Sequence, residues 1–101
     1  MIDLRQLETF CVLAQTRNFT RAADALGYSQ SNITTRIKKL EQELGAVLFK
    51  RHRFSRKVTL TKKGQALLQY ALRLFALVDE MKTATQKRRT DLVSNNKAIR
   101  F

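Results

Sequence analysis

The sequence predicts a mainly α-helical protein with three short helices, a β-hairpin and one long final helix. Apolar residues make up 44% of the 101 residues and proline is absent, a composition that favours a folded, helix-rich chain over a disordered one. Apolar positions recur at helical spacing in four segments, and a basic stretch with strand character separates the third from the fourth. A chain of this length has room for one domain with a modest core and a protruding element.

The first helix is expected over residues 4–16. Asp3 precedes it and can cap the first free backbone amides. The apolar positions recur every three or four residues, as on one face of a helix. They are Leu4, Leu7, Phe10, Cys11 and Ala14. The single cysteine therefore belongs to the apolar face, and we interpret it as a small core residue rather than as a nucleophile.

Two further helices are expected on either side of a turn at Gly27. Thr20 is the expected N-cap of the second helix, which ends at Gly27. Ser29 is the expected N-cap of the third helix, which ends at Gly45. The inward positions of the two helices are Ala22, Ala23, Leu26, Ile33, Ile37, Leu40 and Leu44. Two short helices that meet at a Gly-containing turn are typical of a helix-turn-helix, here at about residues 19–38.

The third helix has a polar face with nothing apolar to bury. At about 100° per residue, the positions opposite the core are Ser31, Thr35 and Lys38, with Asn32, Thr34 and Lys39 beside them. Hydroxyl, amide and ammonium groups on such a face can contact base edges in a DNA major groove. An ordinary solvated helix face is the alternative. The position behind the turn and beside a basic hairpin favours base recognition.

A β-hairpin is expected after the third helix, because residues 47–50 and 57–60 have strand character and flank a polar tip at residues 52–56. Residues 50–63 hold seven of the 20 Lys and Arg residues and none of the eight Asp and Glu residues. Such a concentration of positive charge attracts a polyanion, either nucleic acid or an anionic membrane surface. The hairpin is therefore interpreted as the wing of a winged helix-turn-helix covering residues 1–61.

The arginines of the wing are expected at the DNA. Arg56, and after it Arg53, is placed at a minor groove, where narrow A·T-rich stretches concentrate negative potential and attract guanidinium groups. Lys50 and Lys57 are expected to contact phosphates, whereas Arg51 contacts a phosphate or pairs within the protein. These assignments treat the wing as a second DNA contact beside the third helix.

A long fourth helix is expected from residue 62 to about residue 89, capped by Thr61. Its heptad-like positions are Leu67, Ala71, Leu74, Val78 and Met81. One small domain cannot bury this face together with the apolar residues beside it, so a second copy of the chain is expected to cover it. Lys62 and Lys63 oppose the helix dipole in the first turn, a cost that a nearby phosphate would explain, although ordinary exposed lysines are an equal alternative.

Neither catalysis nor a bound cofactor is expected. His52, the only histidine, has no further ligand at metal-binding spacing, and no Ser, His and acid set is present for a nucleophile. The glycines at 27, 45 and 64 each begin or end an element and form no phosphate-binding loop. The first residues lack the pattern of a secretory signal, so the cytoplasm is the expected compartment and no membrane segment is expected.

Several motifs occur in a fixed order along residues 1–89. They are Leu4-Arg5 with Leu7 and Phe10; Phe19-Thr20 with Ala22, Ala23 and Leu26; Ser29-Gln30; Ile37, Leu40-Glu41 and Leu44-Gly45; Leu48-Phe49 with Arg51; and Leu60-Thr61 with Gly64. Each motif alone is weak. The ordered set resembles the N-terminal DNA-binding region of LysR-type transcriptional regulators. Glu41 is interpreted as structural, paired with a nearby Arg or Lys at the surface.

The resemblance implies that Gln30, Ser31, Thr34 and Thr35 lie at the major groove, with Gln30 nearest to the duplex. We add Lys38 to these base contacts. The expected phosphate contacts are Thr20, Asn32, Arg36, Lys50, Lys57 and Lys62. The chain departs from the family pattern at Ser31, where proline is frequent, and at Thr35, where arginine is frequent, so a different base preference is expected. The segment between Arg51 and Val58 is also longer than in many members.

The sequence therefore predicts a sequence-specific transcription factor that binds a partly palindromic operator as a dimer, with the fourth helices paired. The resemblance further implies a larger ligand-sensing domain, absent from these residues, which would bind a small-molecule inducer, and a tetramer in the full-length form. Residues 90–101 are then a flexible tail towards that domain, and the chain is a fragment or a stand-alone form. Two alternatives stay open: a basic amphipathic module for membrane surfaces or proteins, and a non-specific chromosome-coating protein.

Overall fold

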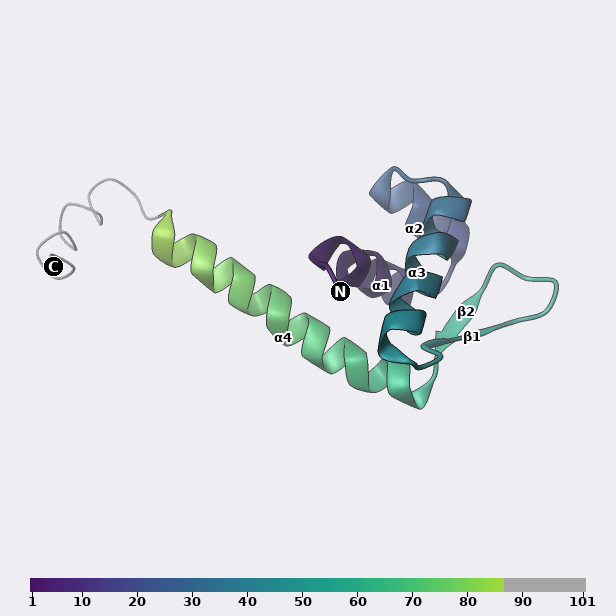
Figure 1. Ribbon diagram of the computed structural model, residues 1–101. Helices are drawn as coiled ribbons and strands as arrows, with labels where there is room; N and C mark the ends of the chain where they lie inside the picture. The colour runs from purple at the N-terminus through teal and green to yellow at the C-terminus, as the bar shows by residue number, and fades with distance from the viewer. Residues whose placement is uncertain (87–101) are drawn as a thin grey trace, which may run out of the picture.

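The computed structural model describes residues 1–86, and within them the fold is mainly helical, as predicted (Figure 1). The elements in order are α1 (Leu4–Thr16), α2 (Phe19–Leu26), α3 (Gln30–Leu44), β1 (Phe49–Arg51), β2 (Val58–Leu60) and α4 (Lys62–Thr85). Residues 87–89 of the predicted fourth helix and the predicted tail at residues 90–101 lie outside the described residues.

The helix ends follow from short-range hydrogen bonds that the sequence mostly predicts. Asp3 and Gln6 form a reciprocal capping box at the start of α1, and Ser29 caps α3. Gly27 and Gly45 end α2 and α3 in the left-handed conformation, which only glycine adopts without steric cost. The start of α3 and the ends of α2 and α3 therefore lie where the sequence predicts.

The predicted N-cap of α2 was wrong by two residues. Asn18 caps the helix, because its side-chain oxygen accepts from the Arg21 backbone N–H at 3.0 Å. Asn is at least as good an N-cap as Thr, and the buried Phe19 is already the first helical residue. Thr20 therefore lies inside the first turn, where its hydroxyl contacts other elements rather than its own helix.

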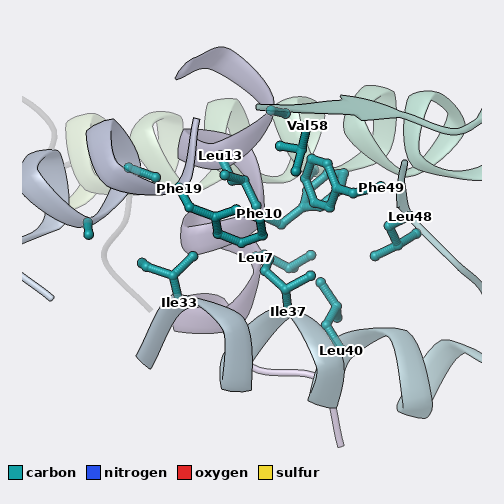
Figure 2. Packing of buried hydrophobic residues seen from close by; sticks show 14 residues of the cluster. Leu7, Phe10, Leu13, Phe19, Ile33, Ile37, Leu40, Leu48, Phe49 and Val58 are labelled. Atoms are coloured by element: carbon teal, nitrogen blue, oxygen red, sulfur yellow. The ribbon is translucent and has the colours of Figure 1, made fainter. Parts of the chain in front are cut away.

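The core is formed where α1, α2 and α3 meet the hairpin (Figure 2). Phe10 and Leu13 of α1 and Ile37 of α3 are fully buried, and the Phe10 ring lies 5.4 Å from the ring of Phe49. The prediction that Leu44 belongs to this core was wrong, since Leu44 is 38% exposed. The chain turns at Gly45, directly after Leu44, and Leu48 is buried near Leu40 instead (Figure 2).

The hairpin is shorter than predicted and is attached to the turn between α1 and α2. Its strands are antiparallel, with Phe49 opposite Leu60 and Arg51 opposite Val58. Val47, predicted in the first strand, lies outside it and is exposed. Its carbonyl accepts from the Thr61 hydroxyl at the start of α4 instead of from the opposite strand. The Val58 N–H donates to the Arg17 carbonyl at 3.0 Å, which fixes the base of the hairpin against the helices.

The helix α4 begins directly after β2, at the edge of the head formed by α1–α3 and the hairpin, and extends beyond it (Figure 1). Gly64 lies so close to Leu48 that a Cβ at this position would clash with the Leu48 carbonyl oxygen. Ala71 is buried and Phe75 packs against the core, but Leu77 and Met81 beyond them are more than half exposed. The 24 residues of α4 extend about 36 Å at 1.5 Å per residue, well past the core.

Candidate nucleic-acid interface

Three elements converge at the hydroxyl of Thr20, in the first turn of α2. Gln30, the first residue of α3, donates from Nε2 to Thr20 Oγ1 at 3.2 Å. Arg56, from the segment between the strands, donates from its guanidinium to the same oxygen at 3.0 Å. The structure thus brings together three residues that the sequence assigned separately, to a phosphate, a base and a minor groove.

The outward face of α3 is polar along its exposed length. Ser31, Thr35 and Lys38 are exposed, while Gln30 and Thr34 are half-buried beside them. The N-cap Ser29 lies within hydrogen-bonding distance of Ser31, with their hydroxyl oxygens 3.1 Å apart. The five predicted base contacts therefore share one helix, with Ser31, Thr35 and Lys38 opposite its buried positions and Gln30 and Thr34 nearer to them. Their contact with DNA stays a prediction.

Asn32 and Arg36 form a pair on the flank of α3. Arg36 Nε donates to Asn32 Oδ1 at 2.7 Å, and the Arg36 guanidinium lies over the ring of Tyr28, 4.6 Å from its centroid. These two contacts leave the terminal nitrogens of Arg36 as donors for an anion. Tyr28, which the sequence analysis did not single out, thus helps to orient a predicted phosphate contact through a cation–π interaction.

The segment between the strands is exposed throughout and carries cations without acidic partners. Within residues 1–86 the only ion pair joins the N-terminal ammonium to Glu43 at 3.5 Å, so the cations of residues 50–63 are not neutralised by carboxylates. Arg51 lies over the Phe19 ring at 4.9 Å, so its partner inside the protein is an aromatic ring. The basic field expected from the sequence therefore remains uncompensated on this side of the described chain.

The tip of the hairpin presents an aromatic residue that the sequence analysis missed. Phe54 is 99% exposed and has a φ of 58°, in the left-handed region. The guanidinium of Arg53 lies 5.9 Å from its ring centroid. A single aromatic residue inside an otherwise polar and basic tip was the available signal, because an isolated apolar residue in such a segment has no core to join.

Glu41 does not form the surface ion pair that the sequence predicted. Its carboxylate accepts from the Leu48 backbone N–H at 2.7 Å, and so it holds the segment between α3 and β1. A charge-assisted bond to a backbone amide satisfies both a carboxylate and a donor that no helix or sheet would pair. The structural role predicted for Glu41 is thus present, with a different partner.

These residues match a known family. The model for bacterial regulatory helix-turn-helix proteins of the lysR family matches residues 4–65. The chain belongs to this family. The LysR-type chain is 41% identical over 86 residues to an uncharacterized HTH-type transcriptional regulator, YwqM, of Bacillus subtilis (strain 168). It is 45% identical over 78 residues to the HTH-type transcriptional regulator BudR of Klebsiella aerogenes.

The LysR-type chain spans only part of these relatives. The matched region covers 85% of this chain and 29% of YwqM, and 77% of this chain and 53% of BudR. Among solved structures, the BenM DNA-binding domain in complex with benA site 1 DNA has a TM-score of 0.79 and 37% identity, covering 85% of this chain and 98% of that one. The DNA complex of the CbnR DNA-binding domain has a TM-score of 0.78 and 34% identity, covering 84% and 95%.

The comparisons confirm the family resemblance and the winged helix-turn-helix fold class. Relatives and fold are those of DNA-binding transcriptional regulators rather than enzymes, as the sequence predicted.

Burial, followed by the charge of Glu8, raises the pKa of the Cys11 thiol, which favours the protonated form that suits a core position. Among residues 1–86 no cluster of three metal-ligating side chains occurs, and no helix has the length and apolarity to cross a membrane.

A hollow of about 460 Å³ lies at the base of the hairpin of the LysR-type chain. Its lining includes Arg17, Arg21, His52 and Lys57. These side chains extend the positive surface from the hairpin to the end of α1. The predicted phosphate contact Lys57 belongs to this wall, whereas Lys62 lies at the start of α4 and is exposed.

Proposed function

We propose that this chain is the DNA-binding part of a sequence-specific transcriptional regulator that binds a partly palindromic operator as a dimer. The observation that carries the proposal is the convergence of α2, α3 and the hairpin at Thr20, which joins the outward face of α3 to the exposed cations of the wing. Two surfaces with complementary roles, one polar and one basic, would then lie along the same duplex.

The outward face of α3 would read bases in the major groove. Gln30 can pair with an adenine through both amide atoms, and the hydroxyls of Ser31, Thr34 and Thr35 can donate or accept at several bases. The methyl groups of the two threonines fit the thymine methyl, and Lys38 can donate to guanine. The chemistry of this face supports discrimination among base pairs as well as attraction to the duplex.

The wing and the surrounding polar groups would hold the phosphates and a minor groove. Arg53 and Arg56 carry the guanidinium groups for the minor groove. The phosphate contacts would come from Thr20, Asn32, Arg36, Lys50, Lys57 and Lys62. Each contacted phosphate releases counterions, so the binding constant should fall with salt at a log-log slope of about 0.9 per contact.

The outer half of α4 supports the proposed dimer. Leu67 and Ala71 of the predicted seam pack against the chain's own core. Leu74 and Met81 are 37% and 58% exposed, and Val78 lies half-buried between them. A second α4 would cover this surface and place two α3 helices in major grooves about one helical turn, or a multiple, apart.

The longer relatives support a further proposal about the whole protein. BudR and YwqM, both named as HTH-type transcriptional regulators, extend well beyond the matched region. We infer that a full-length form would carry a second domain for a small-molecule inducer, would assemble as a tetramer, and would act in the cytoplasm, where bacterial DNA lies. The inducer would bind that second domain and not residues 1–86.

Selection of bound sequences from random duplexes tests the proposal. Gln30→Ala should relax the preference at one or two base positions and cost roughly 1–3 kcal/mol on the selected site, because it removes a paired contact to a base. Lys57→Ala should weaken all sequences alike and lower the salt slope by about 0.9. Gln42→Ala, an exposed glutamine near the other end of α3, is the matched control and should change neither quantity.

Two outcomes would favour the rival functions. Equal affinity for selected and random duplexes at the same salt would indicate a chromosome-coating protein. Binding to anionic vesicles with no binding to duplex DNA would indicate a membrane-surface module. Neither rival explains the polar outward face of α3, since a coating protein needs only positive charges and a membrane module needs positive charges with an apolar face.

A further inference from the structure

Both acceptor sites of the Thr20 hydroxyl are occupied by donors from other elements of the chain. A hydroxyl offers two acceptor sites and one donor. Gln30 and Arg56 both donate to Thr20 Oγ1, at 3.2 and 3.0 Å, and thereby occupy both acceptor sites. The remaining O–H can only donate, and a phosphate oxygen is an acceptor. Thr20 is half-buried, and the bond from Gln30 is partly buried, whereas the bond from Arg56 is exposed to water.

We propose that Thr20 is a positioning residue that couples base recognition by α3 to minor-groove contact by the wing. This inference rests on the proposed function, and it adds a dependence between two contacts that would otherwise act independently. Gln30 lies ten residues from Thr20 along the chain and Arg56 lies 36 residues away, so one oxygen joins two elements that are remote in sequence.

The bonds to Thr20 leave Gln30 and Arg56 with the donors and acceptors that DNA needs. Pairing with adenine needs one N–H and one carbonyl oxygen, and Gln30 retains both after one N–H is given to Thr20. Arg56 retains four of its five N–H groups for a groove or a phosphate. Holding these long side chains in place before binding reduces the rotamer entropy that is lost in the complex.

The backbone beside Thr20 supports the same coupling. The Phe19 N–H donates to the Arg56 carbonyl at 3.1 Å, and Asn18 forms an isolated antiparallel bridge with Lys57. The hairpin segment that carries Arg56 is therefore fixed to the first turn of α2 by the main chain. A shift of the wing on DNA would reach Gln30 through Thr20, and a change at Gln30 would reach the wing by the same route.

A double-mutant cycle of DNA binding by the full 101-residue chain tests the inference. The affinity for the selected duplex is measured for Gln30→Ala, Arg56→Ala and the double variant, first with Thr20 and then with Thr20→Val, which keeps the side-chain shape and removes the hydroxyl. With Thr20, the loss in the double variant should differ from the product of the single losses by about three- to tenfold, as for residues in one hydrogen-bond network.

With Thr20→Val, the two losses should multiply to within about twofold, the level of independent sites. Thr20→Ser should restore the coupling, since serine keeps the hydroxyl. Thr59→Val, which removes a hydroxyl that contacts neither Gln30 nor Arg56, should leave the coupling intact. In the free chain, the side-chain amide resonances of Gln30 should shift in Thr20→Val and in Arg56→Ala but not in Thr59→Val.

The inference is overturned if the losses multiply in the presence of Thr20, if coupling persists in Thr20→Val, or if the Gln30 resonances do not respond to Thr20→Val. Absence of any preference of the unaltered chain for a selected duplex would instead refute the proposed function, and the inference with it. The resonance measurement needs no DNA, so the two failures are told apart.

Discussion

The helices α3 and α4 each have an outward face that the chain's own core leaves uncovered, and the two faces differ in chemistry. On α3 the outward residues are hydroxyls, an amide and an ammonium group, as at Ser31, Thr35 and Lys38. On the outer half of α4 they include Leu77 and Met81. A polar face that gains nothing from burial in a protein core can bind a hydrated polyanion, whereas an exposed apolar face is suited to contact with another protein surface.

The inward and outward apolar positions of these two helices should differ most in their effect on folding. Ile37 on α3 is fully buried, so Ile37→Ala should lower the free energy of unfolding by about 2–5 kcal/mol through lost contacts and a cavity. Leu77→Ala on α4 should cost less than about 0.5 kcal/mol at protein concentrations where the chain is monomeric. Urea unfolding followed by circular dichroism measures both losses. Equal losses would contradict the assignment of Ile37 to the core and of Leu77 to an uncovered face.

An aspartate placed on the outward face of α3 or of α4 should show which face binds DNA and which binds a second chain. Val78→Asp should raise the dissociation constant of the proposed dimer by about 100-fold or more, because an unpaired carboxylate would be buried between two apolar surfaces. Thr35→Asp should leave the dimer intact and abolish DNA binding by repulsion from phosphates. Analytical ultracentrifugation and duplex titration measure the two effects.

The matched control for the dimer is Ala76→Asp, an exposed position about 200° around α4 from Val78. It should leave the dissociation constant unchanged within about twofold, as expected for a surface substitution. A chain that sediments as a monomer at every concentration, or an equal effect of both aspartates, would refute pairing through α4.

The sequence predicted the helices better than the contacts between them. Helical spacing and capping chemistry are local, so the ends of α1 and α3 agree with the structure. The position of Leu44 and the partner of Glu41 depend on how the chain turns after Gly45, which no local pattern specifies. Ala71 belongs to the chain's own core because α4 starts against Leu48, a contact that the heptad spacing alone cannot reveal.

In the candidate site, too, the sequence predicted the local features and missed the contacts between elements. The outward residues of α3 follow from helical geometry once the inward positions are known. The joint contact of Gln30 and Arg56 with Thr20 does not, because it joins residues that are remote in the sequence. The predicted cap role for Thr20 also concealed it, since a cap uses one of the two acceptor sites of its hydroxyl and leaves too few for both Gln30 and Arg56.

The hairpin tip carries a third outward residue, and its substitution should change stability only slightly. Phe54 is apolar and outward, yet it lies on the polar side of the molecule and has a φ of 58°. Phe54→Gly should raise the free energy of unfolding by about 0.5 kcal/mol, because glycine adopts this backbone conformation without a steric penalty. Thermal unfolding measures the change.

Ser55→Gly is the control for the tip, since Ser55 lies next to Phe54 and does not have a positive φ. This variant should be neutral or slightly destabilising, because glycine there gains no relief and adds freedom to the unfolded chain. Destabilisation by Phe54→Gly would show that the ring contributes more through its contact with Arg53 than the backbone conformation costs.

The junction at Gly64 would fix the spacing of the two half-sites in the proposed operator. The missing side chain at Gly64 and the bond from the Thr61 hydroxyl to the Val47 carbonyl at 2.6 Å seat the first turn of α4 directly on the head. No flexible linker therefore separates α4 from the elements that carry the proposed DNA-binding surface. In a dimer paired through α4, the distance between the two α3 helices would then be fixed. An operator with one base pair inserted between its halves would rotate the second half-site away from the second α3.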